Sequence, residues 1–286
     1  MARLEADGPN AKQIEFWNSP VGDSWTEMMD SQDRMLGPLG EAAMAAAQIA
    51  PDDRVIDIGC GCGTTTLELA HRVGPAGYVL GIDVSTPMLE RARERAAREE
   101  NSSLDLQNRD AATYQFEPQS FDRAFSRFGV MFFADPAAAF SNIRAALKSG
   151  GRLAFVCWQP LELNSWMAKT ITVATQYLER PDPPGPDDPG PFAFREPDRV
   201  NGILFDAGFT GIEITPNRLA LDFGIDIEGA ASKLTQLGPM SQPIAQATAD
   251  IQARIRADLA SAIEDYLTDD GVKIDSATWI VSAENP

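Results

Sequence analysis

Along residues 51–158 of the 286-residue chain, segments with the apolar pattern of a strand alternate with segments that have the apolar spacing of a helix. Short runs of branched and aromatic side chains, the first reading RVIDIG, are typical of buried strands, and apolar residues recur at helical spacing between them. The predicted strands lie at residues 54–59, 77–85, 102–110, 121–129 and 151–158. Strands regularly separated by helices indicate βαβ units, so we expect an α/β fold with a mostly parallel sheet and helices on both of its faces.

The segments on either side of this core are mostly helical in pattern. Ahead of it, apolar spacing predicts helices at 23–39 and 40–50. The elements predicted beyond it are a helix at 163–178, a proline-dense loop at 180–197, an amphipathic helix at 198–209, one long strand or a strand pair at 211–223, helices within 225–270 and a final strand at 277–286. The expected organisation is a helical N-terminal lid over 1–50, a ligand-binding core over 51–158, and a remainder, 159–286, that completes the sheet and inserts helical caps at 160–178 and 225–268.

Composition and charge narrow the class of protein. Hydrophobic residues make up 44% of the chain and charged residues 23%, as in an ordinary globular protein of one large domain or of a domain with a smaller cap. The formal net charge of −18 argues against a nucleic-acid or anionic-membrane partner, since both need a basic face. The first residues lack a basic and apolar leader, and the small-apolar run at 42–50 is too short to span a bilayer, so a cytoplasmic location is expected.

Residues 55–66 read VIDIGCGCGTTT, with glycine at every second position directly after a predicted strand. Such bare backbone suits a zinc ligand pair, a dinucleotide site, or another small ligand held against main-chain amides. Cys60 and Cys62 are only one residue apart and His71 is the sole histidine, so the ligand set for zinc is incomplete and no metal is expected. The dinucleotide fingerprint G-x-G-x-x-G would need its third glycine where Thr64 stands.

Acidic residues accompany three successive predicted strands, as Asp57, Asp83 and Asp110. A carboxylate can accept from both hydroxyls of a ribose, which suits Asp83, and Asp110 can accept from an exocyclic amine such as N6 of adenine. Singly, each acid could equally be a helix cap or a solvated loop end. Because open α/β sheets bind ligands in the crevice outside the carboxyl ends of their strands, we expect all three acids near one another.

Taken together, several stretches of residues 51–158 resemble the class I S-adenosylmethionine-dependent methyltransferases. VIDIGCGCG is similar to the first motif of that family, GIDVS to its ribose-binding acid, NRDAA to its adenine-binding acid, and LKSGGRLAFVCW to the segment entering its fifth strand, while FSRFGVMFF stands where the loop after strand four belongs. The resemblance implies a Rossmann-like, doubly wound sheet of seven strands with an antiparallel last strand. The strand at 277–286 would lie between the strand at 151–158 and the one around 211–219.

The resemblance also implies the cofactor, S-adenosylmethionine, its product S-adenosylhomocysteine, and the residues that contact them. The backbone of Gly59, Cys60 and Gly61 would contact the methionine part. The further predicted cofactor contacts are Asp57 at the loop and the cofactor's amine, Asp83 at the ribose, Val84 and Met88 along the adenine, Asp110 and Ala111 at the adenine edge, Ser126 and Phe128 in the methyl-transfer chamber, and Trp17 and Trp25 in the lid. Acids around a positively charged sulfonium complement its charge, whereas a pyrophosphate would be repelled.

The function implied is in-line methyl transfer to a small, partly apolar metabolite that the caps enclose. The predicted acceptor-binding residues are Phe128, Met131, Trp158 and Trp166. No catalytic residue is identified, because a general base is needed only if the acceptor carries a proton, and His71 is expected on the outer side of its helix.

Two other functions stay open at this point: an NAD-dependent oxidoreductase of the same topology, which Thr64 at the third glycine position disfavours, and a cofactor-binding regulatory protein without catalysis. The atom methylated and the oligomeric state are not set by the sequence.

Overall fold

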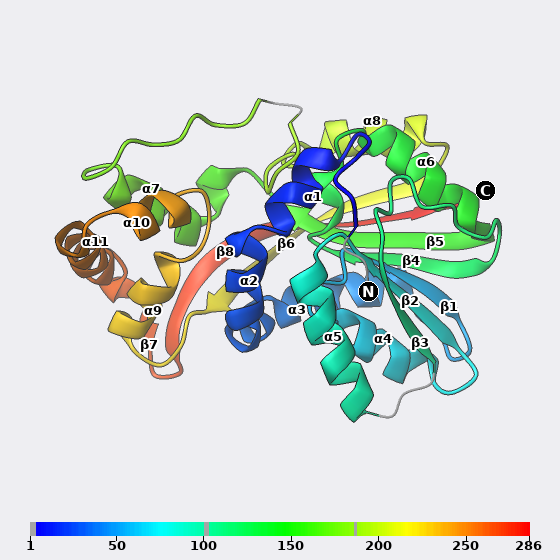
Figure 1. Cartoon of the computed structure of the whole chain (residues 1–286), viewed down its shortest axis with the longest axis horizontal. Helices are drawn as coiled ribbons and strands as arrows, with labels where there is room; N and C mark the ends of the chain where they lie inside the picture. Colours follow the sequence, from blue (N-terminus) through cyan, green and yellow to red (C-terminus); the bar gives the residue numbers. More distant parts are fainter. Residues whose placement is uncertain (1–3, 100–102, 186–187) are drawn as a thin grey trace. The chain divides into compact units, whose positions relative to one another are not determined.

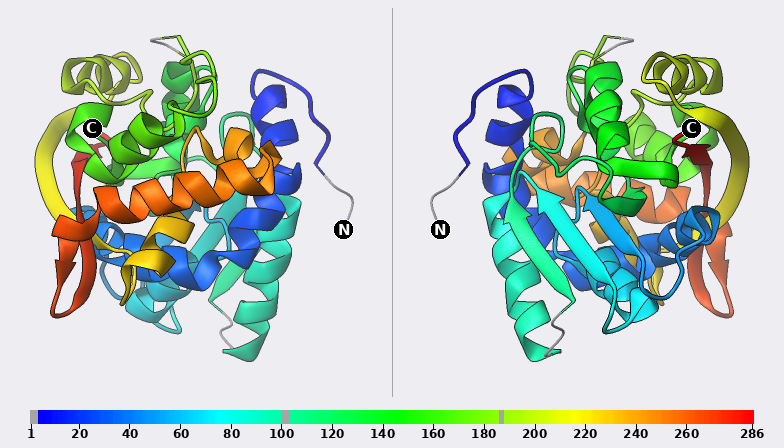
Figure 2. Two further views of the ribbon diagram at one scale, coloured as in Figure 1. Left: turned by 90° about the vertical axis from the view of Figure 1, so that its left-hand side faces the viewer. Right: turned by 90° about the vertical axis from the view of Figure 1, so that its right-hand side faces the viewer.

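The computed structural model of the chain describes residues 4–99, 103–185 and 188–286 (Figure 1 and Figure 2). The chain divides into two compact units. Unit 1 consists of Met1–Trp158, Asp187–Pro216 and Trp279–Pro286, and unit 2 consists of Gln159–Pro186 and Asn217–Thr278. Unit 1 therefore gathers the expected lid, the expected core and the last residues of the chain. Among the described residues, no helix combines the length and apolar character needed to cross a membrane.

The sheet has the strand order β3-β2-β1-β4-β5-β8-β6. Its strands are β1 (Arg54–Ile58), β2 (Tyr78–Asp83), β3 (Leu104–Asn108), β4 (Phe121–Arg127), β5 (Leu147–Trp158), β6 (Thr210–Asp222) and β8 (Gly271–Glu284). The strands β1 to β5 pair in parallel. Strand β8 runs antiparallel to β5, because Gly150 N donates to Asn285 O and Asn285 N donates to Gly151 O, both at 2.8 Å. The predicted mixed sheet, with an antiparallel strand between β5 and β6, is confirmed.

The central strands of unit 1 are apolar on both faces because helices cover both. Helices α3, α4 and α5 lie below the sheet in Figure 1, and α6 and α8 lie above it. Their bounds are α3 (Met29–Ala47), α4 (Thr64–Val73), α5 (Thr86–Arg98), α6 (Pro136–Ala146) and α8 (Pro197–Asp206). Val55, Ile56 and Ile58 of β1 are accordingly at most 2% exposed. The carboxyl ends of β1 to β5 meet at one edge of this sheet.

The N-terminal helices break at a different residue from the one that the sequence indicated. Helices α1 (Ala11–Trp17) and α2 (Pro20–Glu27) precede α3, and the break falls at Met28. The expected boundary between residues 39 and 40 is wrong, since α3 runs unbroken through Gly37 and Pro38. The apolar side of α3 is buried, so packing outweighs the backbone hydrogen bond that proline cannot donate.

Two helix starts show how local sequence acts. Helix α6 begins at Pro136, and the Asp135 side chain accepts a hydrogen bond from Ala138 N at 3.0 Å, as is typical of an aspartate directly before a proline at the first helical position. Helix α4 has no side-chain cap, although threonines, which are good cap residues, follow the glycines: Gly63 is the N-cap residue, at φ +82°. The hydroxyl of Thr64 donates to Asp33, and those of Thr65 and Thr66 donate to Asp57.

Unit 2 contains helices and the ends of two long strands. Its helices are α7 (Ser165–Ala174), α9 (Ile227–Leu234), α10 (Ser241–Gln246) and α11 (Ala249–Ala262), of which α7, α9 and α11 pack against one another. Residues 211–223 form one strand, β6, rather than a pair. Strand β8 begins at Gly271, earlier than expected, because it pairs with the two-residue strand β7 (Leu267–Thr268).

Candidate functional site

The loop between β1 and α4 requires glycine because of its backbone conformation and its close neighbours. Gly59, Gly61 and Gly63 have φ values of +69°, +54° and +82°, a region that other residues avoid. Space is also short, since a Cβ on Gly59 would lie 2.8 Å from the Cα of Gly129, and one on Gly61 would lie 2.9 Å from Met88 Cε. The loop therefore lies against the segment after β4 on one side and against α5 on the other.

Asp83, at the end of β2, lies directly against this loop. Its Oδ2 accepts a hydrogen bond from Gly61 N at 2.7 Å, and its Oδ1 accepts one from Ser85 N at 2.7 Å. Burial raises the pKa of Asp83, and the backbone N–H donors work against that rise. Each carboxylate oxygen has a further lone pair, so Asp83 can still accept from a ligand's hydroxyl groups.

Asp57 is buried completely beneath the loop. Its Oδ2 accepts from the hydroxyls of Thr65 and Thr66, each at 2.7 Å, whereas no described residue donates to its Oδ1. Burial raises the pKa of Asp57 to about 6, against the lowering effect of the two threonines and of Arg127. Sequence reasoning missed the threonines as partners of Asp57; the run TTT directly after the glycines was the available signal.

Asp110 lies just beyond the end of β3 and is also buried. Its Oδ1 accepts from Ala112 N and from the side-chain amide of Asn10, both at 2.9 Å. The adjacent Ala111 is buried, and its carbonyl accepts from Asn142 at 3.0 Å. Strands β2 and β3 pair so that Asp83 stands opposite Asn108, which brings the carboxyl ends carrying the two acids together.

The predicted lid residues lie beside the loops that follow β2 and β4. Trp17 contacts Trp25 edge-to-face, with ring centroids 5.7 Å apart, and contacts Phe132 in the same way at 5.2 Å. Ser85 Oγ donates to the carbonyl of Trp17 at 2.8 Å, and the carbonyl of Val84 accepts from the side chain of Asn18 at 2.8 Å. The structure thus places Trp17 and Val84 in one neighbourhood with Asp83.

Of the predicted acceptor-binding residues, the structure brings Phe128 and Trp158 together. Their rings stack with centroids 4.3 Å apart and planes 14° apart, after β4 and at the end of β5. Phe128 has φ +63°, a strained conformation for a bulky residue and one often found at functional sites. Met131 follows in the same loop and is buried, whereas Trp166 belongs to unit 2, where its ring contacts Phe223.

Ser126, which is also predicted to line the methyl-transfer chamber, is fully buried and bonds to backbone groups. Its hydroxyl donates to Ile58 O at 2.7 Å and accepts from Gly129 N at 3.1 Å. These two bonds tie the segment after β4 to the end of β1. A direct contact of Ser126 with the cofactor stays a prediction.

The cysteines offer no thiolate at neutral pH. Burial raises the pKa of Cys60 well above its usual range, that of Cys62 to about 11, and that of Cys157 as well. Within the part of the chain that the structure describes, no group of three or more histidine, cysteine, aspartate or glutamate side chains could hold a metal ion.

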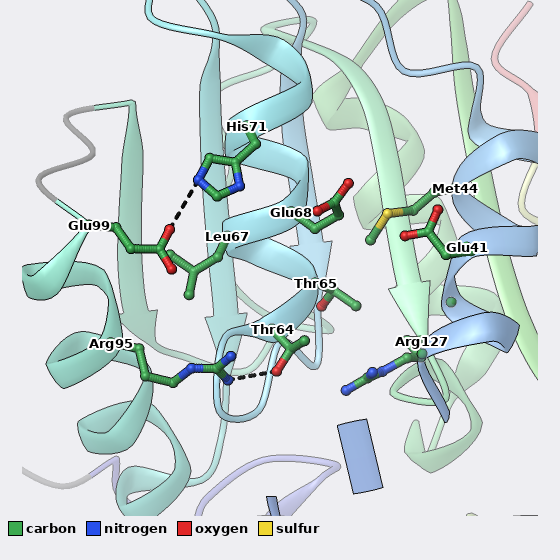
Figure 3. Close-up of a pocket in the computed structure, with 12 residues that line it drawn as sticks. Glu41, Met44, Thr64, Thr65, Leu67, Glu68, His71, Arg95, Glu99 and Arg127 are labelled. Atoms are coloured by element: carbon green, nitrogen blue, oxygen red, sulfur yellow. Dashed lines mark hydrogen bonds and ion pairs between the residues drawn. The ribbon is translucent and has the colours of Figure 1, made fainter. Parts of the chain in front are cut away.

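A separate pocket of about 260 Å³ lies between α3, α4 and α5 (Figure 3). It contains none of the predicted site residues. Its polar side chains largely satisfy one another: His71 pairs with Glu99 at 3.1 Å, and Arg95 donates to Thr64 at 2.6 Å. The side chain of His71 is 59% exposed, as expected for the outer side of a helix.

The residues gathered at the carboxyl edge of the sheet fit S-adenosylmethionine. The Oδ1 of Asp57, to which no described residue donates, is a buried acceptor suited to a donor such as the ammonium group of a bound amino acid. The three carboxylates at this edge favour a cationic ligand over a pyrophosphate.

Comparison with known proteins gives matching results. Residues 55–151 match the family model of the methyltransferase domain. Aklanonic acid methyltransferase DauC from Streptomyces sp. strain C5 is 35% identical over 147 residues, which cover 50% of this chain and 67% of that protein. Demethylmenaquinone methyltransferase from Staphylococcus aureus is 39% identical over 98 residues, 34% of this chain and 40% of that protein.

Among solved structures, phosphoethanolamine N-methyltransferase 2 from Haemonchus contortus, in complex with phosphomonomethylethanolamine and S-adenosylhomocysteine, aligns with a TM-score of 0.54 and 22% identity. The alignment covers 87% of this chain and 52% of that one, so it shows the shared fold. The matches to the staphylococcal and nematode proteins span well under two thirds of their lengths. With its glycine loop, its acids and a relative matched over two thirds of that relative's length, the chain belongs to the class I S-adenosylmethionine-dependent methyltransferases, whose cofactor is S-adenosylmethionine.

Proposed function

We propose that this protein transfers the methyl group of S-adenosylmethionine to a small, partly apolar acceptor. The observation that carries the proposal is the hydrogen bond of 2.7 Å between Gly61 N and Asp83 Oδ2, which joins the glycine loop to the acid expected at the ribose. An acid remote from the loop could not serve a ligand that also contacts the loop.

The proposed role of each acid follows from its surroundings. Asp57 would accept from the cofactor's ammonium group through its unpartnered Oδ1, Asp83 would accept from the ribose hydroxyls, and Asp110 would accept from the adenine amine. The bound cofactor supplies a methyl group on positively charged sulfur. The task of the protein is then to orient the acceptor and exclude water, which can account for a large part of the rate enhancement.

The stacked pair Phe128 and Trp158 supports an acceptor with a flat apolar part. Both rings lie at the carboxyl edge of the sheet, since Phe128 directly follows β4 and Trp158 ends the neighbouring strand β5. The net charge of −18 disfavours a multiply anionic acceptor. Of the compounds that the relatives' names supply, demethylmenaquinone and aklanonic acid therefore suit this chain better than phosphomonomethylethanolamine.

Cofactor binding is tested first, by titration calorimetry with S-adenosylhomocysteine and with NAD. We expect heat from S-adenosylhomocysteine alone; heat from NAD alone would favour an oxidoreductase and overturn the proposal. The matched variants are Gly59→Ala and Gly150→Ala. Both residues have positive φ, but a Cβ on Gly150 meets open space, whereas one on Gly59 meets the backbone of Gly129. Only Gly59→Ala should weaken binding, by roughly tenfold or more.

Methyl transfer is tested next with S-adenosylmethionine labelled in its methyl group. Aklanonic acid, demethylmenaquinone and phosphomonomethylethanolamine are offered singly, and a small-molecule extract is offered as a mixture. Label should enter a small apolar product, and Phe128→Ala should lower that incorporation more than it lowers cofactor affinity. Tight S-adenosylhomocysteine binding without any labelled product would instead favour the regulatory alternative.

A further inference from the structure

Helix α1 carries an asparagine at each end, and both side chains bond to residues outside the helix, although Asn18 Nδ2 also donates to Ile14 O within it at 2.8 Å. Asn10 is the N-cap residue of α1, a position where asparagine ordinarily accepts from an N–H of the first turn. It makes no such bond here, and its side chain is buried. A residue that gives up its usual local bond indicates that another partner is favoured.

That partner is the acid proposed to read the adenine. Asn10 Nδ2 donates to Asp110 Oδ1 at 2.9 Å, and Asn10 Oδ1 accepts from Ala134 N at 2.7 Å. Ala112 N also donates to Asp110 Oδ1. Within the part of the chain that the structure describes, no donor reaches Asp110 Oδ2. The carboxylate is thus held through one oxygen, and the other is left as an acceptor.

Asn18 makes the matching connection at the other end of α1. Its Nδ2 donates to Val84 O at 2.8 Å, and its Oδ1 accepts from Thr86 N at 3.0 Å. These residues follow Asp83, and the neighbouring Ser85 hydroxyl donates to Trp17 O. Helix α1 is therefore joined to the loops that follow β2, β3 and β4 by side chains at both of its ends.

We propose that Asn10 is a positioning residue that fixes the Asp110 carboxylate with Oδ2 toward the adenine amine, and that Asn10 and Asn18 together latch helix α1 over the cofactor. The proposal rests on the proposed function, since Asp110 is assigned to adenine there. A carboxylate held by N–H donors is an acceptor only, so it pairs with the amino group of adenine and repels the carbonyl that hypoxanthine carries at the same position. With helix α1 held in this way, the ring of Trp17 contacts the ring of Phe132, which lies in the same loop as Phe128 and Met131.

The test uses the full chain and two ligands, S-adenosylhomocysteine and its deaminated form, S-inosylhomocysteine. Wild type should prefer the first. Asn10→Ala should lose roughly tenfold in S-adenosylhomocysteine affinity and much of that preference, because the carboxylate is then free to turn. The control, Asn201→Ala on the exposed surface of α8, should match wild type. If Asn10→Ala proves unstable, Asn10→Asp keeps the shape and should bind still more weakly, since it faces Asp110 with a second carboxylate.

A double-mutant cycle separates positioning from a merely structural role. In an Asp110→Ala background, Asn10→Ala should cause a clearly smaller loss of affinity than in wild type, limited to the latch bond with Ala134 N; full losses that simply add would overturn the positioning role. The positioning role would also be overturned if Asn10→Ala kept the wild-type preference for S-adenosylhomocysteine over S-inosylhomocysteine.

The latch is tested without ligand by hydrogen–deuterium exchange, where residues 11–17 should exchange faster in Asn10→Ala than in wild type. Asn10 makes no cap bond to α1, whereas Asn18 also donates to Ile14 O within the helix, so Asn10→Ala is the variant that tests the latch. Equal exchange would overturn the latch. Failure of wild type to bind S-adenosylhomocysteine would instead sink the proposed function, while the exchange comparison still decides the latch.

Discussion

At the scale of single residues, several groups of the site have backbone conformations or surroundings that are energetically unfavourable by themselves. Gly59 and Gly61 have positive φ, which residues with side chains rarely adopt, a Cβ on Gly59 would lie 2.8 Å from the backbone of Gly129, and Phe128 accepts a strained φ. Asp57 is buried, and no described residue donates to one of its oxygens. Such departures from local preference gather at the carboxyl edge of the sheet, where the ligand is proposed to bind, and this is where a functional site is expected to break local rules.

The buried carboxyl of Asp57 predicts a pH-dependent stability. Its pKa of about 6 in the folded chain lies above the value of 3.8 for an exposed aspartate, so the folded state binds the proton more tightly. The stabilisation by the proton is complete below pH 3.8 and is lost as the pH rises through 6. Asp57→Asn removes this titration and should gain stability relative to wild type by up to about 3 kcal/mol between pH 4 and pH 7.

Denaturant unfolding of both proteins at pH 4, 5 and 7 measures this difference. Asn keeps the shape of the side chain and an oxygen for the hydroxyls of Thr65 and Thr66, so the comparison isolates the charge. A stability difference that stays constant across this pH range would contradict the prediction.

At the scale of elements, burial decided where the N-terminal helices end. Gly37 and Pro38 form a pair that normally ends a helix, yet α3 continues through both to Ala47. The apolar face of α3 packs against β4 and β5, and an interruption would expose part of it. Helix α6, by contrast, starts where Asp135 and Pro136 indicate, with the Asp135 side chain capping the helix.

The continuity of α3 can be tested at Gly37. A Cβ there meets no atom within 4 Å, so Gly37→Ala should stabilise the chain by about 0.5–1 kcal/mol through the higher helix propensity of alanine. Gly8→Ala is the matched control, since its Cβ also meets open space but its φ is +69°, and it should destabilise. Chemical denaturation measures both; a Gly37→Ala variant no more stable than wild type would indicate a break in α3.

At the scale of the whole molecule, two features stand out: a mixed sheet with β8 inserted between β5 and β6, and a large excess of acidic residues. The 42 acidic and 24 basic side chains give a net charge of −18. The repulsion among these charges opposes the compact state, and dissolved salt screens it.

Thermal stability should therefore rise with ionic strength. Between about 0.01 M and 0.15 M NaCl the screening length falls from roughly 30 Å to 8 Å, and the melting temperature should rise by a few degrees and then level off. Differential scanning calorimetry at these concentrations measures it. A melting temperature that falls over this range would mean that surface ion pairs such as Arg72–Glu41 outweigh the repulsion.

Much of the fold and part of the candidate site could be predicted because their signals are local or periodic. The strands of the core, the cap at Asp135 and the acids beside the glycines follow from spacing, and the closing strand at 277–286 lies where the family resemblance implied. The threonines that bind Asp57 and the contact of Asn10 with Asp110 could not be predicted, since 100 residues separate the latter pair and nothing local links them.

What this sequence determines by itself is which segments become strands and helices and where bare backbone is required, because hydrophobic periodicity and glycine's freedom act over a few residues. Only the tertiary structure decided which side chains meet: Gly61 with Asp83, Phe128 with Trp158, and Asn10 with Asp110. The tertiary structure also decided that α3 continues through Gly37 and Pro38, a pair that normally ends a helix. The reason is that contacts between distant segments depend on how whole elements pack, and the free energy of that packing exceeds the preference of any single residue.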